Sequence, residues 1–163
     1  MDRLDSVIGQ WADEKPHLDT LPMAMIGRLM RLSKHLETHF TECHKAFDLT
    51  PGEFDVLATL RRSGGDYCLT PSQLIDSMML TSGAMTNRLD KLTAKGFISR
   101  LHSEADRRSV SVALTTTGFD LIEQAIEKHV EMQHQLVSSL SDKDKRTVDQ
   151  LLKHWLMQFD STQ

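Results

Sequence analysis

The stretch at residues 80–96, LTSGAMTNRLDKLTAKG, constrains the fold most strongly, because its apolar residues recur at helical spacing. Three of them share one face of a helix: Met85, Leu89 and Leu92. Either Thr81 or Ser82 can cap the start of this helix, and Gly96 suits the left-handed residue that ends it. The spacing therefore predicts a short amphipathic helix that packs its apolar face onto a core.

The other faces of this predicted helix fit a DNA major groove. Small or hydrogen-bonding side chains lie opposite the apolar face, and Asn87 among them can pair bidentately with adenine. Cations recur along the flank, where they can meet phosphate oxygens. The DNA contacts that we predict for this helix are Ser82, Gly83, Thr86, Asn87, Arg88, Lys91 and Lys95. An ordinary surface helix would show a similar pattern, so the neighbouring sequence has to distinguish the two interpretations.

The segments on either side of residues 80–96 predict a winged helix-turn-helix. Before them, Thr70 and Pro71 can begin another helix, and two helices joined by a tight turn form a helix-turn-helix. After them, residues 97–101 and 110–114 read as two strands joined by a charged loop. A strand pair in this position is the wing of such a module.

Positive charge gathers in the same region. Arg107 and Arg108, at the tip of the predicted wing, can contact the DNA backbone or the minor groove, and Asp106 can hold one of them in place. A solvated charged turn is the alternative. Residues 70–108 hold six Lys and Arg against four Asp and Glu, in a chain whose net charge is −4. A basic module on an acidic body is the electrostatic pattern of a DNA-binding protein.

Amphipathic helices are predicted at both ends of the chain, outside the winged module. Apolar residues recur at helical spacing near the N-terminus, over about 19–46, and again over 115–140 and 141–159. Thr50 and Glu53 form a capping-box pattern that begins a further helix. Exposed apolar faces need a partner, and a symmetric dimer built from both chain ends is the simplest solution, which also matches palindromic operators.

The predicted fold class is therefore mainly α with a small β-wing, a winged helix-turn-helix with dimerisation helices at both ends. We expect one structural domain overall, which suits a chain of 163 residues. Within it, residues 1–48 form an N-terminal helix and dimerisation arm, residues 49–115 the DNA-binding lobe and residues 116–163 the C-terminal dimerisation helices.

Catalytic and membrane functions find no support in the sequence. It contains no G-x-S-x-G, no H-E-x-x-H, no phosphate-cradling glycine loop and no paired C-x-x-C. No apolar run approaches a membrane span, and the first fifteen positions do not read as a signal peptide. Cys43 and Cys68 give no disulfide framework. We expect a cytoplasmic protein that is not an enzyme, needs no cofactor and does not bind a membrane.

Residues 106–118 resemble the wing of the MarR family of winged helix-turn-helix regulators. The family pattern is D-x-R-x, a β-strand and L-T-x-x-G, and the segments DRRS, VSVA and LTTTG supply each part. Residues 92–98, LTAKGFI, resemble the end of the family's recognition helix running into the next strand. The resemblance implies a homodimer that binds a pseudo-palindrome in double-stranded DNA, usually represses, and is released by a small molecule.

The N-terminal part resembles the urate-responsive branch of that family, of HucR and PecS type. Trp11 precedes a turn broken by proline, and residues 18–29 continue the likeness. The ligand-binding residues that this resemblance implies are Trp11, Asp55, Arg88 and, as a further one, Arg100. An indole can stack on a flat purine-like ring while arginine neutralises an anion, so urate or a related purine is the expected effector, and a phenolic acid is the alternative.

Arg88 belongs to both the predicted DNA contacts and the predicted ligand-binding residues, so ligand binding could control DNA binding through it. A ligand that draws Arg88 inward, or competes with Asp55 for it, would move the predicted recognition helix at residues 80–96 relative to the major groove. Plainer roles exist for each residue. Trp11 completes an apolar stripe and could be packing, Asp55 could form a structural ion pair, and Arg88 could touch phosphate alone.

Other sensing chemistries and one other class of function stay open as alternatives. His35, His39 and Cys43 recur at helical spacing and could bind zinc, but no second ligand group has fitting spacing, so we predict no metal site. Cys43 or Cys68 could sense oxidants. A helical module that binds a partner protein, without DNA binding, is the alternative from a different class.

Overall fold

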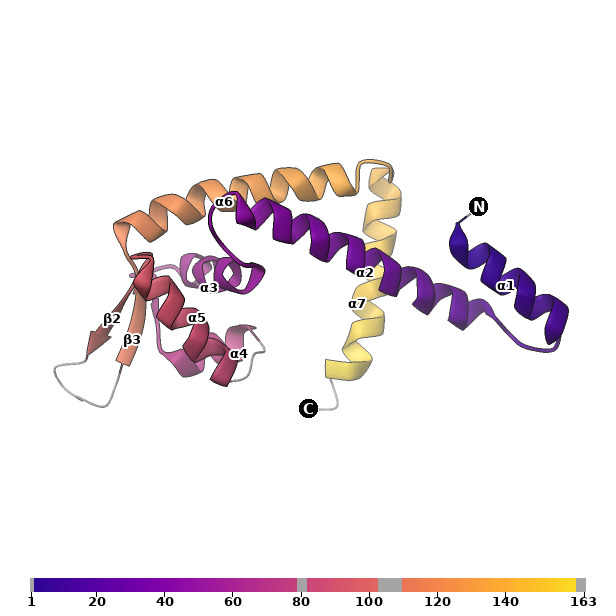
Figure 1. Ribbon diagram of the computed structural model, residues 1–163, viewed down its shortest axis with the longest axis horizontal. Helices are drawn as coiled ribbons and strands as arrows, with labels where there is room; N and C mark the ends of the chain where they lie inside the picture. The colour runs from indigo at the N-terminus through magenta and orange to yellow at the C-terminus, as the bar shows by residue number, and fades with distance from the viewer. Residues whose placement is uncertain (1, 79–81, 103–109, 161–163) are drawn as a thin grey trace.

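The computed structural model of the protein describes residues 2–78, 82–102 and 110–160, and it is mainly helical with a small antiparallel sheet (Figure 1). In chain order its elements are α1 (Arg3–Glu14), α2 (Leu21–Lys45), α3 (Pro51–Arg62), β1 (Cys68–Leu69), α4 (Pro71–Met78), α5 (Ser82–Ala94), β2 (Ile98–His102), β3 (Val110–Leu114), α6 (Thr116–Leu136) and α7 (Asp142–Asp160). This architecture confirms the predicted mainly α fold with a small β-wing. None of the helices in these ranges combines the length and the hydropathy of a transmembrane span.

One lobe of the molecule is built from α3, α4, α5 and the sheet, in which β3 lies between β1 and β2. The strands β2 and β3 are antiparallel, with Arg100 opposite Val112. Each of the three helices, together with β2, β3 and the first half of α6, gives apolar side chains to a common core: Leu57, Leu60, Leu74, Met85, Leu92, Ile98, Val112 and Ile122. Because burial of apolar surface is the dominant favourable term in folding, this core decides which side of α5 faces outward.

Helix α3 begins with the capping box that the sequence predicts. The Thr50 hydroxyl accepts a hydrogen bond from the Glu53 amide (3.2 Å), and the Glu53 carboxylate accepts one from the Thr50 amide (2.8 Å). Pro51 occupies the first helical position, where its missing N–H would have no partner within the helix. The N-terminal turn of α3 is thereby fixed beside α5.

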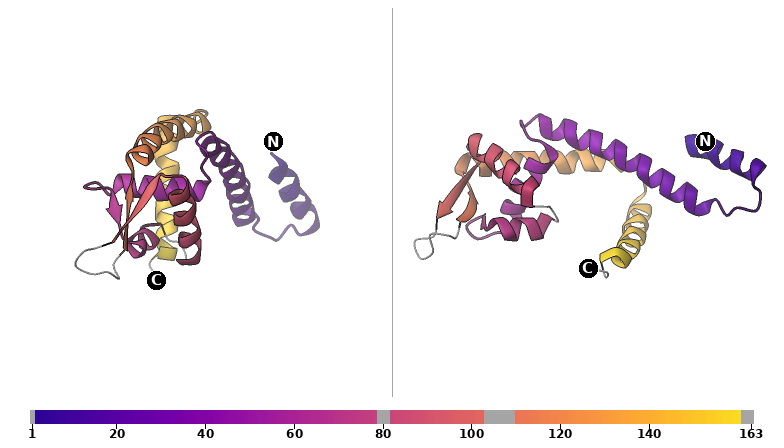
Figure 2. Two further views of the ribbon diagram at one scale, coloured as in Figure 1. Left: turned by 60° about the vertical axis from the view of Figure 1, so that its left-hand side comes forward. Right: turned by 60° about the horizontal axis from the view of Figure 1, so that its bottom comes forward.

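The helices α1, α2, α6 and α7 form arms that reach beyond the lobe. Figure 1 and the right-hand view of Figure 2 show α1 and α7 outside the lobe, with α2 running outward from the lobe towards α1. Neither α1 nor α7 contains a buried residue. Large apolar side chains are instead exposed along these arms, among them Leu21, Met30, Leu32, Leu151, Leu156 and Phe159.

Several predicted boundaries move by a few residues. The second strand of the sheet is Ile98–His102 rather than 97–101, and the long helix after the wing ends at Leu136 rather than near residue 140. Val137 departs from helical dihedrals and caps that helix. At the start of α2, the Asp19 carboxylate accepts the Leu21 amide (3.0 Å), whereas the Thr20 side chain makes no capping hydrogen bond.

Candidate nucleic-acid interface

The outward face of α5 follows directly from how its inner face is buried. Met85, Leu89 and Leu92 are 1%, 3% and 0% exposed, as their spacing predicts. The side chains of Thr86, Asn87 and Lys91 are exposed on the rest of the helix surface. The amide and the ammonium group have the chemistry needed to reach base edges and phosphate, and the Asp90 carboxylate that is exposed beside them pairs with Arg100.

Four predicted DNA contacts fall where the structure gives no account of the side chain. Ser82 is the first residue of α5 and Gly83 the second, but their surroundings lie outside what the structure describes. Arg107 and Arg108 lie between the described ends of β2 and β3 and are outside the described residues. Their contacts with DNA therefore stay predictions.

Lys95, a further predicted DNA contact, is engaged inside the lobe. Its ammonium donates to the Asp48 carbonyl oxygen and lies 3.3 Å from a Glu53 carboxylate oxygen. Glu53 is 1% exposed. Although burial raises the pKa of Glu53, hydrogen bonds from Thr50 and Lys95 outweigh it and hold the pKa below its usual value. In the unbound protein, Lys95 thus ties the end of α5 to the start of α3.

Arg88 lies on the same flank of α5 and also faces α3. It is half-buried, and its guanidinium group packs against Gly52 in the first turn of α3. Asp55, one turn further along α3, is exposed. The described residues include no ion pair between Arg88 and Asp55, so the polar pair that the family resemblance implies is not formed here.

The opposite flank of α5 carries a cavity and the fourth predicted ligand residue. Arg100 on β2 lies 2.5 Å from the Asp90 carboxylate of α5. A cavity of about 440 Å³ opens beside it between α4, α5 and the sheet, and its walls are Pro71, Ile75, Met85, Thr86, Leu89, Arg100, Val110 and Val112. One cation and one hydroxyl in mostly apolar walls suit a small aromatic anion.

Trp11 is not brought to the other ligand residues within one chain. It lies on α1 and is 36% exposed. Helix α1 and the lobe that carries Asp55 and Arg88 stand at opposite ends of the molecule (Figures 1 and 2). A pocket formed by all three residues would therefore have to take its indole from a second copy of the chain.

Two clusters that sequence reasoning missed join the lobe to α6. The Arg61 guanidinium lies over the rings of Tyr67 and Phe119 and 2.5 Å from the Glu123 carboxylate. In the second cluster, His44 and His129 share a hydrogen bond of 3.0 Å, and the Phe54 ring stacks on His44 at a centroid distance of 3.9 Å. The partners on α6 are far apart in sequence from the others, 62 positions for Arg61 and Glu123 and 85 for His44 and His129, so no spacing rule could pair them.

The histidines of α2 and its one cysteine, Cys43, do not form a metal site with other described residues. No group of three or more His, Cys, Asp or Glu side chains is placed to hold a metal ion in the part of the chain that the structure describes. Cys43 is half-buried, and burial raises the pKa of its thiol, which disfavours the reactive thiolate.

Comparison with known proteins agrees with this geometry. The family model described as "MarR family" matches residues 49–110. The regulator PecS of Dickeya dadantii is 38% identical over 149 residues, which cover 91% of this chain and 90% of that protein. The multiple antibiotic resistance protein MarR of Escherichia coli is 32% identical over 78% of this chain and 88% of its own length. A crystal structure of mutant MarR from E. coli complexed with operator DNA superposes with a TM-score of 0.72, at 29% identity, over 85% of this chain and 99% of that one.

Proposed function

Because this chain belongs to the MarR family of transcriptional regulators, we propose that it binds operator DNA as a homodimer and is released by a small anionic aromatic or purine-like effector. In this proposal the lobe binds the operator, the arms form the dimer interface with a second copy of the chain, and repression ends when the effector binds. The three segments 1–48, 49–115 and 116–163 carry the first arm, the lobe and the second arm, and the first half of α6 also packs into the core of the lobe.

The orientation of α5 is the observation that carries the proposal. Burial of its three apolar residues leaves Asn87 and Lys91 exposed together on the outward side. We assign Asn87 to a base edge and Lys91 to phosphate, with Ser82, Gly83 and Thr86 allowing close approach. Arg107 and Arg108 on the wing are assigned to the DNA backbone. We propose that Lys95 holds α5 against α3 in the free protein, because its ammonium group already forms an ion pair with Glu53.

Exposed apolar surface on the arms supports the homodimer. A groove of about 660 Å³ runs between α2 and α7, and its walls include Leu29, Leu32, Leu151, Leu152 and Trp155. Because α7 buries no residue within its own chain, a second copy would remove this apolar surface from water. Two lobes related by a two-fold axis would then match the two half-sites of a palindrome.

Two sites are candidates for the effector. The cavity beside Arg100 has mostly apolar walls, and a phenolic acid or a purine anion there would compete with the Asp90 carboxylate for the guanidinium group. The second site combines Asp55 and Arg88 of one chain with Trp11 of a second copy, and it suits urate through stacking and charge. Both sites touch α5, so a ligand in either would bias the position of the recognition helix.

A DNA titration at two salt concentrations tests the proposal. We expect a duplex from the upstream region of the gene to bind with an affinity that falls steeply as salt rises. Lys91→Ala should weaken binding to every duplex, and Asn87→Ala should reduce the preference for the upstream duplex over random DNA. Lys153→Ala, an equal charge change at an exposed position on α7, is the matched control and should bind as the wild type does. A folded protein that binds no upstream duplex would contradict the proposal and favour a protein-interaction module.

A second titration identifies the effector site. Urate, xanthine and salicylate are added to the DNA complex, and release is followed by fluorescence anisotropy. If the cavity beside Arg100 is used, Arg100→Gln abolishes release, whereas Trp11→Phe leaves it unchanged. If the site made of Asp55, Arg88 and the Trp11 of a second copy is used, Trp11→Phe abolishes release, whereas Arg100→Gln leaves it unchanged. Release that neither variant affects would exclude both sites.

A further inference from the structure

Gly52, in the first turn of α3, lies directly beneath the guanidinium group of Arg88. A Cβ atom at position 52 would lie 2.5 Å from Cζ and 2.8 Å from Nη2 of Arg88, and nearer still to Nε. Real Cβ atoms do not approach other heavy atoms so closely. Since α3 and α5 pack side by side in the lobe (Figure 1), the space that this glycine leaves is occupied by an arginine of the predicted recognition helix.

The atoms in that space belong to the end of a flexible side chain. Adding a methyl group at position 52 would therefore move Arg88 without disturbing the backbone. Gly118 provides the contrast, because a Cβ there would lie 2.8 Å from the carbonyl carbon of Phe97, and nearer to its oxygen, which the backbone holds in place. Alanine is also a better helix former than glycine, so α3 itself has no need of a glycine at position 52.

Shape, rather than charge, holds Arg88 in this position. The guanidinium group lies at the N-terminal end of α3, which carries the positive pole of the helix dipole. The nearby Glu53 carboxylate already serves the Thr50 amide and Lys95. Among the residues that the structure describes, Arg88 has no ion pair. Electrostatic interactions therefore stabilise the guanidinium group little in this position, and an ion pair with a DNA phosphate would be more favourable.

We propose that Gly52 is a positioning residue that keeps the Arg88 guanidinium against α3 and away from the outward face of α5. The inference rests on the proposed function, since it concerns how that face meets DNA. Arg88 contacts phosphate only after it leaves Gly52, and this displacement opposes DNA binding. Filling the space with a methyl group removes the resting position, so the guanidinium is exposed before DNA arrives.

A double-mutant cycle tests the proposal, using full-length wild type, Gly52→Ala, Arg88→Ala and the double variant. With a random-sequence duplex, Gly52→Ala should bind roughly three- to tenfold more tightly, and the slope of log K against log salt should stay the same, because Arg88 contacts the same phosphate in both complexes. In the Arg88→Ala background, the same change at position 52 should have no effect, because no guanidinium is left to displace. An equal effect in both backgrounds, or no effect in either, would overturn the proposal.

Two further measurements separate this test from neighbouring effects. Gly9→Ala, at a helical glycine whose added Cβ would meet nothing within 4 Å, is the matched control and should leave DNA affinity unchanged. Without DNA, an NMR cross-peak between Arg88 Hε and the Gly52 Hα protons should be present in the wild type and lost in Gly52→Ala. Absence of that cross-peak in the wild type would refute the resting position. Failure of the wild type to bind DNA, with the cross-peak present, would instead refute the proposed function.

Discussion

The lobe and the arms of this molecule bury their apolar side chains in opposite ways. In the lobe, Leu57, Leu60 and Leu74 are fully buried. On the arms, Leu151 and Leu156 are 65% and 59% exposed, although α7 is longer than any of α3, α4 and α5 in the lobe. The lobe therefore has a complete core within one chain, whereas the arms have only half of one. A second copy is the simplest source of the other half.

The junction between these two regions is aromatic and tightly packed. The His44 side chain of α2 stacks on Phe54 of α3 and bonds to His129 of α6, so one cluster contacts three helices. Burial and the neighbouring His129 lower the pKa of His44 to about 4. Burial also lowers the pKa of His129, and Asp55 opposes that shift. Both shifts favour the neutral form of the ring where the lobe meets the arms.

A matched pair of leucine substitutions gives the largest expected effect. Leu57→Ala leaves a cavity in the lobe and should lower the free energy of unfolding by about 2–5 kcal/mol. Leu151→Ala, at an exposed position, should change the stability of the single chain by less than about 0.5 kcal/mol. Urea denaturation of both variants at low protein concentration, below dimer formation, measures the difference.

The same pair distinguishes the regions at high protein concentration. There Leu151→Ala should shift sedimentation towards the monomer, whereas Leu57→Ala should retain the dimer as long as it is folded. Equal losses of stability in the two variants at low concentration would mean that the arms have a core of their own.

Acid should weaken the junction before the rest of the lobe. Since the pKa of His44 is about 4 when folded and about 6.5 when unfolded, the unfolded chain binds more protons between these values. Stability should therefore be full above pH 6.5 and fall by up to about 1.4 kcal/mol per pH unit towards pH 4. Urea denaturation across this range measures the slope, and His44→Phe should flatten it. An equal slope in the variant would assign the acid sensitivity to other groups.

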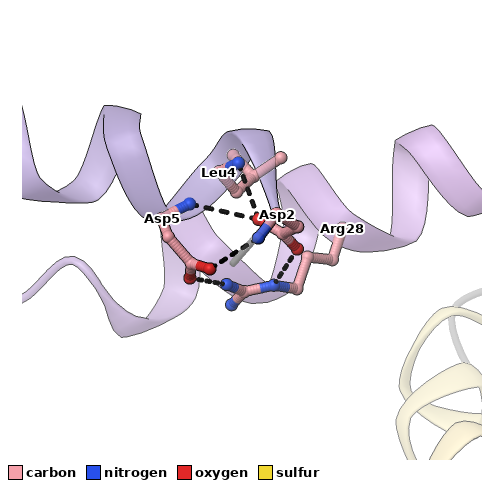
Figure 3. A network of polar contacts seen from close by, with 4 residues as sticks. All are labelled: Asp2, Leu4, Asp5 and Arg28. Carbon is pink, nitrogen blue, oxygen red and sulfur yellow. Dashed lines mark hydrogen bonds and ion pairs between the residues drawn. The ribbon is translucent and has the colours of Figure 1, made fainter.

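The smallest effect is expected at the attachment of α1. Arg28 of α2 holds this helix through Asp2 Oδ2 at 2.8 Å and Asp5 Oδ1 at 2.6 Å (Figure 3). The same Asp2 side chain accepts the Leu4 amide and caps α1. Exposed ion pairs contribute little and are screened by salt, so Arg28→Ala should speed amide exchange in α1 alone.

Hydrogen exchange measured by mass spectrometry checks this attachment. Arg31→Ala, an exposed arginine on the same helix with no ion pair among the described residues, is the control and should leave α1 unchanged. Unaltered exchange in Arg28→Ala would show that apolar contacts, such as Leu4 against Gly27, hold α1 instead.

Local signals predicted the fold well. Apolar spacing placed α5 and its buried face, and the pattern at Thr50 and Glu53 predicted the start of α3, because both depend on residues within one or two turns. Local signals could not predict which of the basic side chains on the flank of α5 are exposed and which, like Lys95, pack against α3. Lys95 contacts Glu53 across 42 positions because α5 packs against the start of α3, and only that packing decides which cations stay exposed.

The predicted ligand residues show the same limit. The family resemblance proposed Trp11, Asp55 and Arg88 as one site, but sequence similarity does not say which chain supplies each residue. The structure separates α1 from the lobe, so a site made of all three residues would need two copies of the chain. Arg100 was paired with a ligand by the same resemblance, and in the free protein its partner is Asp90.

The central claim is that the lobe binds DNA and that the arms form a dimer with a second copy of the chain. The mass of the DNA complex tests this claim most directly. Native mass spectrometry of the protein with a duplex from its own upstream region should give two chains per duplex. Leu151→Asp, which places a charge on the apolar surface of α7, should lower that number at the same protein concentration. One wild-type chain per duplex, or no complex at all, would contradict the account.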